Sequence, residues 1–199
     1  MVARLSLAAA LCAAAACTGS VDGNVDPGPD TVGPDAGMMT PLGDPTAVDR
    51  AQEWVDAKLP YCQAANHKAD ADTACSATCT RPDNAEWDPY RSDCSGLVSW
   101  AWGLPAPGHT TATLAPYDTS VSHPIDAMDL LPGDAINNDH HTMLFASWVM
   151  PGVQARFLEE PGCSSSQPYA REYIANVTLM GQTLLVQYRG TYTAIRHDK

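Results

Sequence analysis

Cys94 is the residue whose type and setting point most directly to chemistry. It stands in YRSDCSGLVSWAWGL, where a polar turn leads into apolar residues Leu97, Val98 and Ala101 at helical spacing. A helix that starts at Cys94 directs unpaired N–H groups and a partial positive charge at the thiol, which stabilises a thiolate. The same N–H groups can donate to the oxyanion that forms when a thiolate attacks a carbonyl. We predict that Cys94 is a nucleophile rather than a buried structural thiol, and that Ser95 is a candidate oxyanion or substrate contact.

A nucleophilic thiol needs a partner that takes and returns its proton, and histidine suits that role near neutral pH. Among six histidines, His141 opens the strand-like run HTMLFASW, so its ring would lie on a rigid element. If that strand starts one residue earlier, His140 would face inward instead. Glu159, near the end of ARFLEE, is the best third group to orient the imidazole, and Glu160 is its alternative by the same question of register.

The cysteine count separates Cys94 from the others. Of seven cysteines, Cys12 lies in a predicted export signal and Cys17 is a candidate lipid-attachment site. Four cysteines remain, namely Cys62, Cys75, Cys79 and Cys163. They are candidates for two disulfides, and four cysteines can pair in three ways. A zinc site is the alternative, but no second matching pair of ligands follows. We expect no metal and no organic cofactor.

The N-terminal region is typical of an exported bacterial lipoprotein. Residues 1–16 combine Arg4 with a short apolar run too brief to span a bilayer, and three alanines precede Cys17. Residues 17–43 are rich in Gly, Pro and Asp and predict a disordered tether that follows the lipid-attachment Cys. We expect a protein of the cell envelope anchored to a membrane by its lipid; cleavage without lipidation, which gives a secreted protein, is the alternative.

The charge balance excludes one class of partner. The chain has 11 Lys and Arg against 23 Asp and Glu, for a formal net charge of -12. Such a chain repels phosphate backbones, and no basic stripe interleaved with aromatic residues is present. We therefore expect no nucleic-acid binding.

The remaining residues, 44–199, predict one α+β domain, expected to be monomeric. Asp44 and Pro45 are start signals for a helix that ends before Pro60, and a Cys-rich insertion occupies about residues 61–90. A second helix is predicted from Cys94 to about Trp102. Five short runs in the last third predict the strands of an antiparallel sheet: AINND, TMLFASWV, ARFLEE, LLVQYRG and TYTAIRH.

The order of three motifs resembles the NlpC-type cell-wall cysteine peptidases. These motifs are DCSGLV from Asp93, LLPGDAI from Leu130 and HTMLF from His141. The resemblance implies a papain-like α+β domain, with N-terminal helices and a nucleophile at a helix start packed on an antiparallel sheet. It places Cys94 as the nucleophile, His141 as the base and Glu159 as the third residue. It also suggests that the Pro60–Tyr61 step carries an oxyanion donor, Tyr61.

These expectations combine into a functional hypothesis. The chain is predicted to be an exported cysteine hydrolase that cleaves amide or peptide bonds through a thioester, with peptidoglycan stem peptides as the substrate class that the resemblance implies. Two alternatives are a module that binds cell-wall or other peptides without cleaving them, and an acyltransferase in which an amine captures the thioester.

Overall fold

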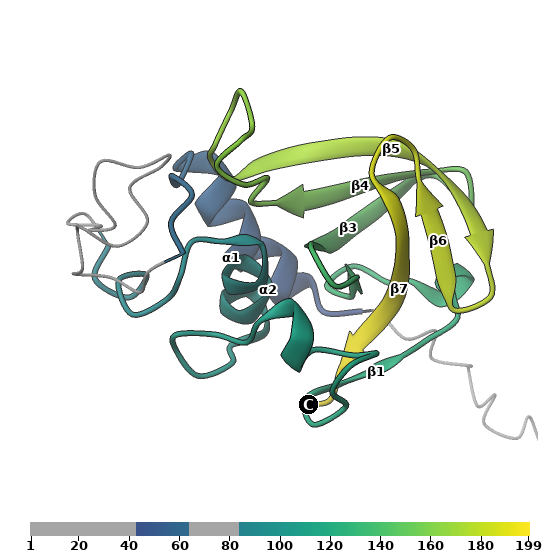
Figure 1. Cartoon of the computed structure of the whole chain (residues 1–199), viewed down its shortest axis with the longest axis horizontal. Helices are drawn as coiled ribbons and strands as arrows, with labels where there is room; N and C mark the ends of the chain where they lie inside the picture. Colours follow the sequence, from purple (N-terminus) through teal and green to yellow (C-terminus); the bar gives the residue numbers. More distant parts are fainter. Residues whose placement is uncertain (1–42, 64–83) are drawn as a thin grey trace, which may run out of the picture. The chain divides into compact units, whose positions relative to one another are not determined.

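Two short helices, α1 and α2, lie side by side in this computed structural model (Figure 1). The helix α1 spans Pro45–Asp56, and the side chain of Asp44 accepts a hydrogen bond of 3.3 Å from a first-turn N–H. The helix α2 spans Cys94–Trp102 and is capped in the same way by Asp93. Both helices start at the predicted residues, because a capping side chain before an apolar run of helical spacing is a local signal.

Among the residues that the structure describes, seven strands and two short 3-10 helices, η1 (Thr111–Thr113) and η2 (Ala127–Asp129), complete the secondary structure. The strands are β1 (Ser122–Pro124), β2 (Ala135–Asn137), β3 (Thr142–Met150), β4 (Gln154–Glu159), β5 (Arg171–Met180), β6 (Thr183–Val186) and β7 (Gly190–His197). The five predicted runs coincide with β2, β3, β4, β6 and β7. The sequence prediction missed β1 and β5; in β5 exposed or half-exposed positions dominate, so its apolar signal is weak.

The strands form one antiparallel sheet that closes on itself. The strand order is β1-β7-β2-β3-β4-β5-β6, and β6 also pairs with β7. Six strands, β2 to β7, therefore form a ring, while β1 pairs with the C-terminal end of β7, on the edge whose first half pairs with β6. Figure 1 shows β3 to β7 curving around a common interior.

This architecture corrects the predicted fold class. The expected papain-like α+β domain, with an N-terminal helical region packed on a sheet, is wrong: the part of the protein that the structure describes is mostly a closed six-stranded antiparallel barrel with only two short helices. The error has a physical cause. Alternation along a strand shows which side chains share a face, but it does not show which strands pair. The unpredicted strand β5 joins β4 to β6 and thereby completes the ring.

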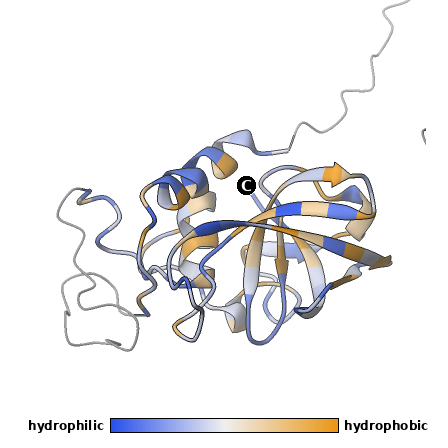
Figure 2. Cartoon of the chain, turned by 90° about the horizontal axis from the view of Figure 1, so that it is seen from above, coloured by the Kyte–Doolittle hydropathy of each residue, from blue (hydrophilic) through white to orange (hydrophobic). Residues whose placement is uncertain are grey.

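The barrel has apolar side chains on both faces of its central strands. Along β3, Met143 and Phe145 belong to the cluster that includes Phe157 and fills the barrel. The alternate residues Leu144 and Ala146 belong to a second cluster, which packs beneath α1 and α2. Successive side chains of a strand point to opposite faces, so one strand supplies both clusters. Figure 2 shows the resulting mixture of hydrophobic and hydrophilic bands along the strands.

The structure describes residues 43–63 and 84–199. They belong to one compact unit that spans Met39–Lys199. The predicted signal of residues 1–16, the lipid-attachment residue Cys17 and the tether up to residue 42 lie outside the described residues. In the two described segments, no helix is long and apolar enough to cross a membrane.

Candidate functional site

Cys94 is the first residue of α2, at the end of the helix that meets the start of β3. Its thiol is free, and the residue is partly exposed to solvent. The backbone N–H groups of Ser95 and Thr142 donate toward the sulfur, so the thiol lies at the helix start and beside the first residue of β3. Thr142 follows His141 directly, so the backbone that carries the predicted base lies beside the predicted nucleophile.

The resting protonation state of Cys94 differs from the sequence expectation of an easily ionised thiol. Burial raises the pKa of the Cys94 thiol to about 12, and the carboxylate of Asp93 adds to the increase. The backbone N–H groups of Thr142, Ser95 and Cys94 itself lower this pKa, but their effect is smaller. The thiol therefore holds its proton at neutral pH.

His141 and Glu159 form the polar pair that the sequence predicted. The ring Nε2 of His141 and the Oε2 of Glu159 are 2.9 Å apart, and Glu159 is completely buried. A carboxylate can only accept hydrogen bonds, so in the neutral ring Nε2 carries the proton and Nδ1 has a free lone pair. This tautomer allows Nδ1 to accept a proton from a thiol.

The structure also decides the register that the sequence left open. Asn138 Oδ1 accepts hydrogen bonds of 2.9 Å from the backbone N–H of both His140 and His141, which fixes the turn before β3. The side chain of His141 is only 15% exposed, whereas that of His140 is 86% exposed and pairs with Asp139 at 3.2 Å. His141, not His140, therefore faces the site.

Glu160, the alternative to Glu159, is also fully buried, but the carboxylate that contacts His141 belongs to Glu159.

Two arginines that the sequence analysis missed complete the surroundings of Glu159. Arg171 donates from Nε and Nη2 to Glu159 Oε1 at 2.9 and 2.8 Å, and Arg189 Nη2 donates to the same oxygen. Burial by itself would raise the pKa of Glu159. The hydrogen bond and charge of His141, the charge of Arg189 and the hydrogen bond of Arg171 outweigh burial, so the pKa lies below its usual value.

Tyr192, on β7, is a further residue of the site that sequence reasoning did not find. Its ring meets that of His141 edge to face, with centroids 6.5 Å apart, and its hydroxyl interacts with Asn138. Burial and the charges of Glu159 and Cys94 raise the pKa of Tyr192 to about 12, against a lowering by a neighbouring guanidinium. Tyr192 therefore packs a neutral ring against the imidazole.

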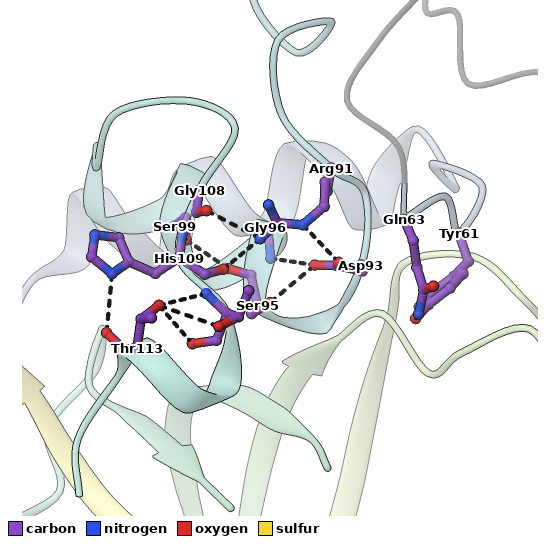
Figure 3. A network of polar contacts seen from close by, with 11 residues as sticks. Tyr61, Gln63, Arg91, Asp93, Ser95, Gly96, Ser99, Gly108, His109 and Thr113 are labelled. Carbon is purple, nitrogen blue, oxygen red and sulfur yellow. Dashed lines mark hydrogen bonds and ion pairs between the residues drawn. The ribbon is translucent and has the colours of Figure 1, made fainter. Parts of the chain in front are cut away.

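The turn before α2 is held by a network around Asp93 (Figure 3). Asp93 Oδ1 accepts the N–H of Gly96 at 2.7 Å, and Oδ2 accepts Arg91 Nε at 2.9 Å. Asp93 thus acts as the N-cap of α2. Gly96 is required by a close approach: a Cβ on it would lie 1.8 Å from the carbonyl oxygen of Arg91. The absence of a side chain on Gly96 lets the preceding turn pack on the helix.

The two candidate oxyanion residues occupy different positions. The Ser95 hydroxyl donates to Asp93 at 3.1 Å, so the group of Ser95 that faces the sulfur is its backbone N–H. Tyr61 is buried, its hydroxyl accepts a hydrogen bond of 2.9 Å from Gln63, and Figure 3 shows this pair apart from the Asp93 network. The backbone N–H of Cys62 bonds to Ser92, which brings the Tyr61 segment beside the turn before Cys94.

The other predicted cysteines divide into two groups. Cys62 and Cys163 each take part in a disulfide. Cys75 and Cys79 lie outside the described residues, so the pairing of the four stays a prediction.

A cavity of about 400 Å³ lies at the other end of α2, where Trp102, Asp134, Arg196 and Lys199 are among its lining residues. Cys94 is at the opposite end of the same helix, so this cavity does not form part of the site.

Over the described ranges, 43–63 and 84–199, no group of three or more His, Cys, Asp or Glu side chains is arranged to hold a metal ion. No protein-family model, no curated protein and no solved structure matches this chain. The geometry of Cys94, His141 and Glu159 is therefore the basis for any functional inference.

Proposed function

We propose that this protein is a cysteine hydrolase that cleaves amide bonds through a thioester at Cys94. The observation that carries the proposal is the arrangement at the start of β3: the N–H of Thr142 lies near enough to the Cys94 sulfur to lower the pKa of the thiol, and the preceding residue, His141, is oriented by buried Glu159. A free thiol at a helix start beside an oriented imidazole is the arrangement that nucleophilic catalysis needs.

The chemistry follows from the atoms available. As the sulfur attacks the substrate carbonyl, the thiol proton passes to Nδ1 of His141, and the carbonyl oxygen becomes an oxyanion near the N–H groups at the start of α2. The C–N bond then breaks, and His141 gives the proton to the leaving amine. Water, deprotonated by the same imidazole, attacks the thioester; the C–S bond breaks, and the proton returns to Cys94.

The substrate class that we propose is the stem peptide of peptidoglycan. It is supported by the order of the Cys, Pro-Gly-Asp and His motifs and by the export signal and Cys17 in the sequence. In the same proposal, a lipid on Cys17 anchors the protein to a membrane of the cell envelope. Replacement of Cys17 by Ser should move the protein from the membrane fraction to the soluble fraction.

The decisive experiment is hydrolysis of purified muropeptides by the full chain and three variants. Cys94→Ala and His141→Ala should each lower the rate at least about 10³-fold, because each removes a member of a unit that works together. His140→Ala is the matched control, since this exposed ring points away from the site, and it should stay within about twofold of the wild type. Hydrolysis by Cys94→Ala at the wild-type rate would overturn the proposal.

A peptide-binding module is the second candidate, and one observation favours it. The pKa of the Cys94 thiol is raised to about 12, as expected for a thiol that is not used as a nucleophile. In the same experiment, retention of muropeptides without any cleaved product, unaffected by Cys94→Ala, would support this candidate.

A further inference from the structure

The end of the barrel where β3 turns into β4 carries a group of exposed apolar side chains. Met150 ends β3 and Val153 lies in the turn that follows, while Met128 belongs to η2 and Met180 ends β5. Each of these four residues is between 49% and 57% exposed. We call Met128, Met150, Val153 and Met180 the methionine cap.

The chain segments that form the methionine cap lie against one another. The N–H of Ala127 donates to the carbonyl oxygen of Gly181 at 2.9 Å, which joins η2 to the turn between β5 and β6. A Cβ on Gly152, in the turn between β3 and β4, would lie 3.1 Å from Cε of Met128 and 3.7 Å from Cδ1 of Leu179. Figure 1 shows the β5–β6 turn on the side of the barrel away from α1 and α2. The cap is therefore one contiguous surface, and a contiguous exposed apolar patch marks an interaction site, whereas single exposed apolar residues do not.

The charges beside the methionine cap restrict what could cover it. Asp126 and Asp129 flank Met128 and are exposed, and the whole chain has a formal net charge of -12. An acidic partner or a bilayer of anionic lipids would be repelled. Methionine side chains are flexible and adapt to irregular apolar surroundings, such as acyl chains. The cap is therefore suited to the apolar boundary of a zwitterionic bilayer.

The proposed anchor joins the domain close to the methionine cap. Gly43 is the first described residue, and a Cβ on it would lie 3.1 Å from Cβ of Leu131, which is three residues beyond Met128. Even fully extended, the chain from Cys17 to Gly43 can span at most about 90 Å. A lipid on Cys17 would keep the cap close to the bilayer at a high effective concentration, so a weak contact is sufficient.

We propose that the methionine cap is a membrane-contact surface, which lies in the boundary between headgroups and acyl chains of the bilayer to which the protein is anchored. The inference rests on the proposed lipid at Cys17 and adds an orientation to it. The strand β3 runs from Thr142, beside Cys94, to Met150 in the cap, which is roughly 25 Å at the usual rise of a strand. Contact through the cap therefore directs the Cys94 site away from the bilayer.

Trp148 is a natural reporter of this contact. It lies two residues before Met150 and packs against the cluster that fills the barrel, with its ring centroid 5.1 Å from that of Phe145. The other four tryptophans belong to, or pack against, the cluster beneath the helices: Trp54, Trp87, Trp100 and Trp102. Bromine atoms on lipid acyl chains quench tryptophan emission only at short range, so brominated vesicles distinguish contact through the cap from contact through the helices.

The experiment uses the lipidated full chain on phosphatidylcholine vesicles, with and without bromine on the acyl chains. Co-flotation measures attachment, and the difference in emission between the wild type and Trp148→Phe gives the Trp148 component. This component should fall by about half or more on brominated vesicles, because an interfacial apolar surface lies roughly 5–10 Å into the boundary between headgroups and acyl chains. The emission of Trp148→Phe, which comes from the four other tryptophans, should stay unchanged.

Two variants and one change of solvent test the chemistry of the contact. Met128→Gln/Met150→Gln keeps the length of both side chains but makes them polar, so it should lose the quenching of Trp148 and still float with the vesicles. Ile174→Gln is the matched control: Ile174 is 49% exposed on β5, six residues before Met180, and its replacement should keep the wild-type quenching. Since the cap carries no charge, the quenching should also persist when NaCl is raised from about 0.1 M to about 1 M.

Co-flotation of the wild type with no quenching of its total emission would overturn the inference, and this result needs no variant to fold. Quenching that persists in Met128→Gln/Met150→Gln, folded by circular dichroism, would also overturn it. So would a Cys17→Ser protein that is dimeric in gel filtration and becomes monomeric with the same two replacements, because a second copy would then cover the cap.

Failure of the proposed function has different signatures. If the wild type does not float with the vesicles, the proposed lipid anchor is wrong and the inference falls with it. If the wild type floats and Trp148 is quenched but no muropeptide is hydrolysed, the proposed hydrolase activity is wrong and the membrane contact stands.

Discussion

Replacement of Glu159 by Gln tests the site most directly, because the side chain keeps its shape and loses its charge. A glutamine has one carbonyl oxygen and one NH₂ group. If the oxygen faces the three arginine donors, the NH₂ group faces Nε2 of His141 and forces the proton onto Nδ1, where it blocks transfer from Cys94. If the oxygen faces His141, the NH₂ group meets the N–H groups of Arg171 and Arg189. Neither orientation satisfies the site.

The loss of stability expected for Glu159→Gln follows from the burial of the Glu159 carboxylate. Breaking a fully buried ion pair destabilises a protein by about 3–5 kcal/mol. The two arginine side chains are 24% and 23% exposed and can recover some hydration, so we expect the lower end, about 3 kcal/mol. Hydrolysis should fall by about 10³-fold or more, as when an orienting carboxylate of a catalytic triad is replaced by its amide.

The assay is urea unfolding at several pH values, together with muropeptide hydrolysis. The pKa of Glu159 is lowered on folding, so the ionised carboxylate contributes stability that is fully present above its unfolded pKa of about 4.3. That stability is lost as pH falls through the lower folded pKa. The difference in free energy of unfolding between the wild type and Glu159→Gln should therefore be largest at neutral pH and become smaller below about pH 4.

The matched control is Glu172→Gln on the adjacent strand β5. Its side chain is 42% exposed and pairs with Arg156 at 2.7 Å, so the change should cost less than about 1 kcal/mol and leave hydrolysis unchanged. Equal stability and activity for Glu159→Gln and Glu172→Gln would refute the reasoning.

Three other substitutions test separate parts of the structure. Asp93→Asn keeps a capping oxygen but removes the negative charge that helps to raise the pKa of Cys94, so the pH dependence of iodoacetamide labelling should shift to lower pH. Gly96→Ala brings a Cβ to 1.8 Å from a backbone carbonyl oxygen and should lower the free energy of unfolding in urea by about 3 kcal/mol. Gly181→Ala is the control: a Cβ there meets open space, and the positive φ of 63° should cost about 1 kcal/mol. Phe145→Ala empties a fully buried position of the barrel and should cost about 3–5 kcal/mol by the same measurement, while an effect below about 1 kcal/mol would contradict the interior packing described above.

The sequence by itself determined the local features of this protein. The starts of α1 and α2 depend on Asp44 and Asp93, and each capping signal lies within a few residues of the helix that it begins. The short apolar runs TMLFASWV and ARFLEE located β3 and β4, and the helix-start setting of Cys94 singled it out among the cysteines.

Only the tertiary structure decided how these elements meet. Closure of the sheet depends on β7 pairing with both β2 and β6, and no local pattern encodes the partners of a strand. The same closure brings Arg171, from a strand that the sequence did not predict, and Arg189, from the turn before β7, onto Glu159. Arginines are common on protein surfaces, and these two become part of the site because pairing across the barrel places them on a carboxylate that water cannot reach.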